Sequence, residues 1–182
     1  EPLVHTGVSS DRRDWLQLDY LPEGRARVSF FHAGLGLLRG REFAIPADRK
    51  ITVELECGAL LPPAAHPMYE GWSAAEQTVA SRDLRVRVNG EERLRAAVSC
   101  YESTRADLQI GRMAWGSGGL QPEFTGRVIR VGKLPARRPS LLLEGSGRRE
   151  PMELTVWLPS DRAAWRDPLI TTGSGKDFDV LY

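Results

Sequence analysis

Short stretches in which apolar and polar residues alternate recur along this chain, and they constrain its fold more than any other feature. The clearest are Trp15 to Tyr20, Arg25 to Phe30, Ile51 to Glu56 and Leu84 to Val88. Weaker ones follow at Leu108 to Ile110, Phe124 to Val131, Leu141 to Leu143 and Glu153 to Trp157. A period of two places the apolar side chains on one face of an extended strand and the polar ones on the other. About ten or more short strands, each with one buried and one wet face, predict a β-sandwich or barrel.

Two local signals between these stretches predict particular structures. Asn89-Gly90 separates two alternating segments, and both residue types tolerate the positive φ that a tight hairpin turn requires. The segment from Ser73 to Ser81 is the one helix that we expect, with Ser73 as its N-cap and Glu76 as the partner of Ser73 in a capping box. This helix lies inside a long loop that runs from Pro62 to about Arg82, and such loops are often functional.

Length and charge exclude several classes of protein. A chain of 182 residues suits one core, and its 18 Gly and 12 Pro favour many turns over long helices. The 25 basic residues nearly balance the 24 acidic ones, so no overall field steers the protein towards nucleic acid. No apolar run approaches the roughly 18 residues of a membrane-spanning helix. We therefore expect no nucleic-acid partner and no membrane insertion.

The beginning of the chain returns near its end. The segment from Glu1 to Gly7, EPLVHTG, is echoed by the segment from Asp167 to Gly173, DPLITTG, and an acidic-aromatic pair follows each copy. Such an echo is typical of tandem arrays. We therefore predict a module over residues 1–166, and in residues 167–182 the start of a second, similar module. Two alternatives are open: residues 167–182 are a closing strand of the same sandwich, or two short strands resemble one another by coincidence.

Cys57 and Cys100 are the only cysteines, too few for a disulfide scaffold or a cysteine-rich metal site. Both lie in apolar segments with the pattern of strands. Two buried free thiols that pack as small hydrophobic groups are the favoured interpretation. A single disulfide between neighbouring strands is the alternative.

Several motifs in the middle of the chain occur in a characteristic order. Val86-Arg87-Val88-Asn89-Gly90 precedes Leu108-Gln109-Ile110-Gly111, which precedes Phe124-Thr125-Gly126-Arg127-Val128. This order resembles the concanavalin A-like lectin/glucanase superfamily, and its laminin G-like branch in particular. The resemblance implies an all-β, antiparallel β-sandwich of jelly-roll type, to which the local signals above add one short helix in the long loop. It also implies an extracellular or cell-envelope location and makes calcium a candidate cofactor, although no calcium ligands can be transferred by position.

Catalytic residues are not apparent. The glucanases of this superfamily carry the motif E-x-D-x-x-E, which this chain lacks; its nearest approach is Glu54-Leu55-Glu56, whose carboxylates share one face of a strand at about 7 Å. A solvated strand face explains this pair better. His5, His32 and His66 are too scattered for a zinc signature, and His66 is better explained as a structural loop residue.

Sugar binding requires flat aromatic faces with polar planar groups at their edges. Five residues in or beside the irregular segments meet this requirement: Tyr69, Trp72, Tyr101, Arg112 and Trp115. A role for Trp72 and Trp115 in capping the core is an equal alternative, while Trp15 and Trp157 fall on strand periodicity and are expected in the core. A basic cluster follows at Arg127, Arg130, Lys133, Arg137 and Arg138; it suits an acidic polysaccharide, although a solvated strand face explains it as well.

These observations favour a non-catalytic recognition module within a larger, repetitive protein. The expected ligand is carbohydrate, either a polysaccharide or a glycoconjugate, and neighbouring modules of the same protein are candidate partners. A glycoside hydrolase or polysaccharide lyase that uses Glu54, Glu56, His66 or Tyr69 is one alternative. A protein-protein adhesion or assembly module is the other.

Overall fold

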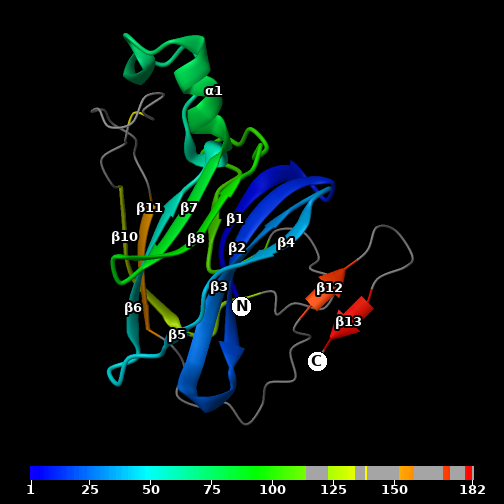
Figure 1. The fold of residues 1–182 in the computed structure, drawn as a ribbon, viewed down its shortest axis with the longest axis vertical. Coiled ribbons are helices and arrows are strands. Elements are labelled where there is room, and N and C mark those ends of the chain that lie inside the picture. The colour runs from blue at the N-terminus through cyan, green and yellow to red at the C-terminus, as the bar shows by residue number, and fades with distance from the viewer. Residues whose placement is uncertain (114–122, 134–137, 139–151, 158–169, 173–178, 182) are drawn as a thin grey trace.

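The computed structural model of the chain describes residues 1–113, 123–133, 138, 152–157, 170–172 and 179–181. The described residues form antiparallel strands with one α-helix, in a β-sandwich-like arrangement of two main sheets (Figure 1). The predicted all-β class is therefore confirmed. Neither main sheet closes on itself within the described ranges, so the barrel alternative is not supported there.

The first sheet, sheet A, contains the N-terminal strands in the order β4-β3-β2-β1-β9, and β5 also pairs with β3. Its strands are β1 (Pro2–Ser9), β2 (Arg12–Leu21), β3 (Arg25–His32), β4 (Gly36–Arg39), β5 (Phe43–Ala44) and β9 (Gln109–Ile110). The first three are joined by short turns, and Glu23 and Gly24 both have positive φ in the β2–β3 turn. Register in this hairpin pairs Asp14 with His32 and Leu16 with Phe30.

The second sheet, sheet B, has the order β10-β11-β6-β7-β8. Its strands are β6 (Lys50–Glu56), β7 (Asp83–Val88), β8 (Glu91–Ala97), β10 (Arg127–Lys133) and β11 (Met152–Trp157). The predicted hairpin at Asn89-Gly90 is confirmed, because these two residues join β7 to β8 with φ values of 52° and 80°. The side-chain amide of Asn89 also accepts a hydrogen bond from the Thr52 N–H, so the turn is fastened to β6 as well.

The core lies between the two sheets. Strands β6 and β7 alternate between buried and half-exposed residues, as a period of two predicts. Sheet A contributes Leu16, Leu18, Val28 and Phe30, and sheet B contributes Ile51, Val53, Leu84 and Val86. All eight side chains are buried, so removal of apolar surface from water holds the two sheets together.

The prediction of one wet face for every strand is wrong for the centre of sheet A. In β2, every residue from Trp15 to Asp19 is buried, including those that point away from the core. On that outer face the Trp15 Nε1–H donates to Gln17, the Gln17 amide donates to Asp19, and Asp19 accepts from Ser29 at 2.6 Å. Paired polar groups tolerate burial, which is why a polar pattern in the sequence did not signal exposure here. Trp15 is therefore buried as expected, but outside the core cluster.

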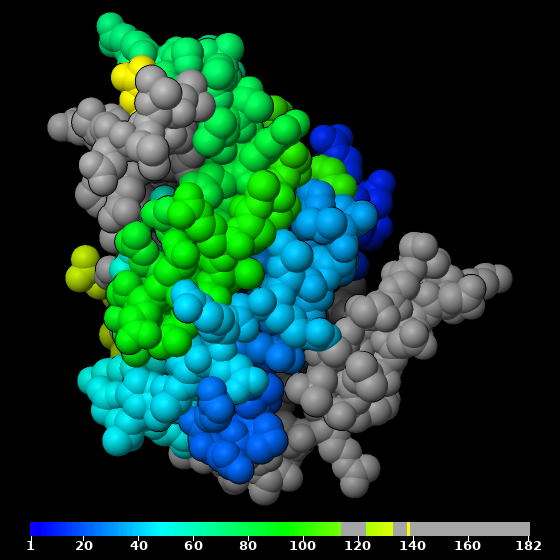
Figure 2. Space-filling view, viewed as in Figure 1, coloured from blue at the N-terminus to red at the C-terminus, as the bar shows by residue number. Residues whose placement is uncertain are grey.

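Residues 58–82, here called the insertion, project beyond one end of the two sheets (Figures 1 and 2). They contain two short 3-10 turns, η2 (Gly58–Leu60) and η3 (Pro67–Tyr69), followed by α1 (Ala74–Arg82). The predicted helix and its cap are confirmed, because Ser73 Oγ accepts from the Glu76 N–H while the Glu76 carboxylate accepts from the Ser73 N–H. Gly58 lies so close to α1 that an added Cβ would be 2.1 Å from the Ser81 carbonyl oxygen.

Part of the echo forms one strand of a separate strand pair. Strand β12 (Ile170–Thr172) pairs antiparallel with β13 (Asp179–Leu181), in a two-stranded sheet separate from sheets A and B. The corresponding first copy, β1 and β2, is also an antiparallel pair. Whether residues 167–182 begin a second module stays a prediction. The expected strand at Leu141 to Leu143 lies outside the described residues.

Candidate binding site

Two of the predicted sugar-binding residues, Tyr69 and Trp72, lie together in the insertion. Their rings meet edge to face, with centroids 5.2 Å apart and planes at 81°. Tyr69 is buried and its hydroxyl donates to the Pro62 carbonyl oxygen at 2.9 Å, whereas Trp72 is only half-buried. Tyr69 therefore supports the indole of Trp72, and of the two rings it is Trp72 that has surface available to a ligand.

The insertion is fastened by a bidentate ion pair that the sequence did not suggest. Arg138 donates to the two carboxylate oxygens of Glu76 at 2.6 and 2.8 Å, and also to the Gly71 carbonyl oxygen. These bonds, with those from Ser73, lower the pKa of the Glu76 carboxyl to about 2. The Arg138 guanidinium is therefore already bonded to residues of the insertion. Of the other predicted basic residues, Arg127 and Arg130 are exposed on β10, while Arg137 and the Lys133 side chain lie outside the described residues.

Tyr101 lies in a different cluster, at an end of the core. Its ring stacks on His32 with centroids 4.7 Å apart, and its hydroxyl donates to the Ala33 carbonyl oxygen. The buried Asp14 carboxylate accepts from the Tyr101 N–H at 2.9 Å and pairs with His32 Nδ1 at 2.6 Å. Burial raises the pKa of the Asp14 carboxyl. The register of β2 and β3 places Asp14 opposite His32. Counting residues outward from the turn between these two strands could have found this pairing in the sequence.

The two cysteines are free and lie close to this cluster. Cys57 is buried and Cys100 is half-buried. A hydrogen bond with the Cys100 side chain, burial and the charge of Asp14 all raise the pKa of the Cys57 thiol well above its usual value. Since the thiolate is the nucleophilic form, Cys57 is unsuited to attack a substrate. The favoured interpretation of packed free thiols is confirmed for Cys57, whereas Cys100 keeps some exposure.

The residues considered for catalysis or for a zinc site are paired, buried or engaged in local hydrogen bonds. Glu54 forms an ion pair with Arg87 at 3.5 Å, and Glu56 is buried. His66 is exposed and its Nδ1 accepts from the Met68 N–H, which caps η3. His5 is fully buried on the outer face of sheet A, and burial together with the charge of Arg13 lowers the pKa of its imidazole.

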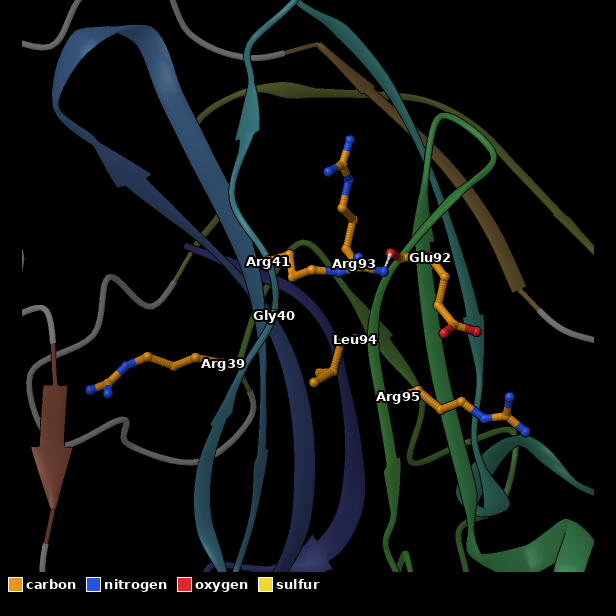
Figure 3. A pocket seen from close by; sticks show the side chains of 7 residues that line it. All are labelled: Arg39, Gly40, Arg41, Glu92, Arg93, Leu94 and Arg95. Atoms are coloured by element: carbon orange, nitrogen blue, oxygen red, sulfur yellow. Dashed lines mark hydrogen bonds between the residues drawn. The ribbon is translucent and has the colours of Figure 1, made fainter.

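A groove lined by four arginines occupies the seam between the sheets (Figure 3). Its volume is about 330 Å³, and its lining residues are Arg39, Gly40, Arg41, Glu92, Arg93, Leu94 and Arg95. The end of β4 and the two residues after it supply one side of this arginine groove, and β8 supplies the other. Pattern analysis missed the site, although arginines at alternate positions, 39 and 41 on one segment and 93 and 95 on another, are visible in the sequence.

The remaining residues predicted to bind sugar lie away from these sites or outside the described residues. Arg112 is exposed and forms an isolated bridge with Glu123. Trp115 lies outside the described residues. Within the described ranges, no group of three or more His, Cys, Asp or Glu side chains could hold a metal ion, and no helix is long and apolar enough to cross a membrane.

Comparison of the chain with protein-family models, curated proteins and solved structures gave no match. The function must therefore be argued from the sites themselves.

Proposed function

We propose that the chain is a non-catalytic recognition module that binds carbohydrate. The observation that carries the proposal is the half-buried indole of Trp72, held on a projecting insertion by the edge of Tyr69. A flat aromatic face with its orientation already set suits the apolar face of a sugar ring, because little side-chain freedom is lost on binding.

The rest of the insertion supports this role by limiting the motion of Trp72. The capping box at Ser73 and the ion pair between Glu76 and Arg138 fasten the segment that directly follows the indole. The Arg138 bond to Gly71 fastens the residue that precedes it. A ligand would thus meet a preformed surface on an insertion that projects from the two sheets, where binding residues are commonly found.

The finer identity of the fold is part of the same proposal. Two antiparallel sheets over one core are compatible with the concanavalin A-like jelly roll, and with its laminin G-like branch in particular. We further propose an extracellular or cell-envelope location, with calcium as a candidate cofactor. These statements rest on the resemblance of the sequence motifs.

A screen of the protein against immobilised neutral and charged glycans, with calcium and with chelator, tests the proposal. Saturable binding that is lost in Trp72→Ala, while the variant stays folded, is the expected result. Val79→Ala is the matched control, because Val79 is an exposed apolar residue (41%) on α1 of the same insertion. A blank screen under both conditions, or equal loss of binding in the two variants, would count against carbohydrate recognition at Trp72.

One observation favours an assembly role as a second candidate. Strand β12, which lies within the echo of the N-terminal segment, pairs with the following strand β13 as β1 pairs with β2. Repeated units of this kind are typical of arrays in which neighbouring units pack on one another. Removal of residues 167–182 tests the arrangement: an unchanged melting temperature is expected if they begin a neighbouring module, and a large fall would make them part of this sandwich.

A further inference from the structure

We propose that the arginine groove is a second binding site, which recognises an anionic polysaccharide bearing sulfate or carboxylate groups. The inference rests on the carbohydrate-binding role proposed above and adds the charge class of the ligand. The groove lies on the seam between the sheets, whereas Trp72 lies in the insertion at one end of them, so the two sites can be tested separately.

The groove has a rigid backbone. Gly40 donates its N–H to the Val28 carbonyl oxygen at 2.8 Å, and Arg41 donates its N–H to the Arg93 carbonyl oxygen at 2.7 Å. An added Cβ at Gly40 would lie 2.7 Å from the Val28 oxygen and 2.9 Å from the Arg93 oxygen, closer than real Cβ atoms approach. The two arginine-bearing segments are therefore locked against each other, and their side chains start from fixed positions.

Two of the four arginines form no ion pair with a carboxylate of the described residues. Arg41 donates to the Glu92 carbonyl oxygen, and neither Arg39 nor Arg41 has a carboxylate partner among the described residues. By contrast, Arg93 pairs with Glu91 at 2.6 Å and lies over the ring of Phe43. Figure 3 shows the side chains of Arg39 and Arg41 leaving their segment on opposite sides. Two such guanidinium groups favour a ligand that carries several anionic groups, each of which an arginine can bind through paired N–H donors.

The remaining arginine extends the site. Arg95 is separated from Asp83 by 3.7 Å, and its side chain is 57% exposed, so this ion pair is easily exchanged for a ligand. Figure 3 shows the side chains of Arg39 and Arg95 leaving the groove in opposite directions. The cations therefore do not converge on one small anion. They are spread along a surface, as a linear polymer with repeated charges would require.

Polysaccharide fits this groove better than single-stranded nucleic acid. Sites for single strands combine positive charge with aromatic rings on which bases stack. The lining residues of the groove include no aromatic side chain, and the nearby Phe43 is buried beneath Arg93. A sulfated or uronic-acid polymer needs only the charges and hydrogen-bond donors that the arginines supply.

The test measures binding of dextran sulfate by isothermal calorimetry, with neutral dextran and a poly(dT) oligonucleotide of matched length as comparison probes. We expect dextran sulfate to bind with an affinity that falls as salt rises, neutral dextran to give no signal at the groove, and poly(dT) to bind more weakly. The double variant Arg39→Gln with Arg41→Gln should weaken dextran sulfate binding by about tenfold or more.

The matched control is Arg82→Gln with Arg105→Gln, which removes the same charge at two exposed arginines outside the groove. Unchanged binding in the groove variant, equal loss in the control, or poly(dT) binding as tight as dextran sulfate would each overturn the proposal. Arg39→Gln alone, at an exposed residue, serves if the double variant does not fold. Trp72→Ala should leave dextran sulfate binding intact, so failure at Trp72 and failure at the groove are distinguishable.

Discussion

Replacement of Asp14 by alanine should markedly destabilise the protein. The carboxylate is 1% exposed on β2 and accepts hydrogen bonds from His32 on β3 and from the Tyr101 N–H, 87 positions further along the chain. Asp14→Ala leaves the Tyr101 N–H and the His32 Nδ1–H without an acceptor and unfastens the segment after β8 from sheet A.

The magnitude follows from the two lost bonds. A hydrogen bond to a charged group contributes roughly 1.5–3 kcal/mol, so the pair contributes about 3–6 kcal/mol. Burial of the carboxylate opposes this gain, as the raised pKa of Asp14 indicates, and alanine removes that cost. We therefore expect the free energy of unfolding to fall by about 2–4 kcal/mol.

Urea denaturation followed by tryptophan fluorescence and circular dichroism measures this change. Asp14→Asn is the matched control, because the amide oxygen can still accept from the Tyr101 N–H, and about half the loss is expected. His32→Ala completes a double-mutant cycle, in which Asp14 and His32 should be coupled by about 1 kcal/mol. A loss below about 1 kcal/mol in Asp14→Ala, or purely additive effects in the cycle, would refute the reasoning.

Two further results are expected. Because the folded pKa of Glu76 is lowered to about 2, the stabilisation from this carboxylate is complete above its ordinary pKa of 4.5 and is lost as pH falls through about 2. An acid titration of the tryptophan fluorescence, with the signal of Trp72→Ala subtracted to isolate Trp72, should show this loosening in the wild type but not in Glu76→Gln; matching curves would contradict it. Alkylation followed by mass spectrometry should modify Cys100 before Cys57, whose thiol is buried and has a raised pKa; equal rates would contradict this order.

The candidate sites were only partly predictable. Tyr69 and Trp72 were correctly placed in one irregular segment, but the sequence did not distinguish the buried ring from the half-buried one. Tyr101 was predicted to bind sugar through its aromatic face, but in the structure this ring stacks on His32. The arginine groove was not predicted, since its two sides come from segments more than fifty positions apart that meet at Gly40.

The sequence by itself determined the local structure of this protein. Alternation placed the strands, Asn89-Gly90 determined the hairpin, and the Ser73 capping box started the helix, because each signal acts among residues only a few positions apart. Only the tertiary structure decided which strand faces are buried and which distant groups pair. Alternation with a period of two indicates which side chains share a strand face, but it does not indicate whether that face is buried. For this reason the buried outer face of β2, the Arg138–Glu76 ion pair and the arginine groove emerged only from the folded chain.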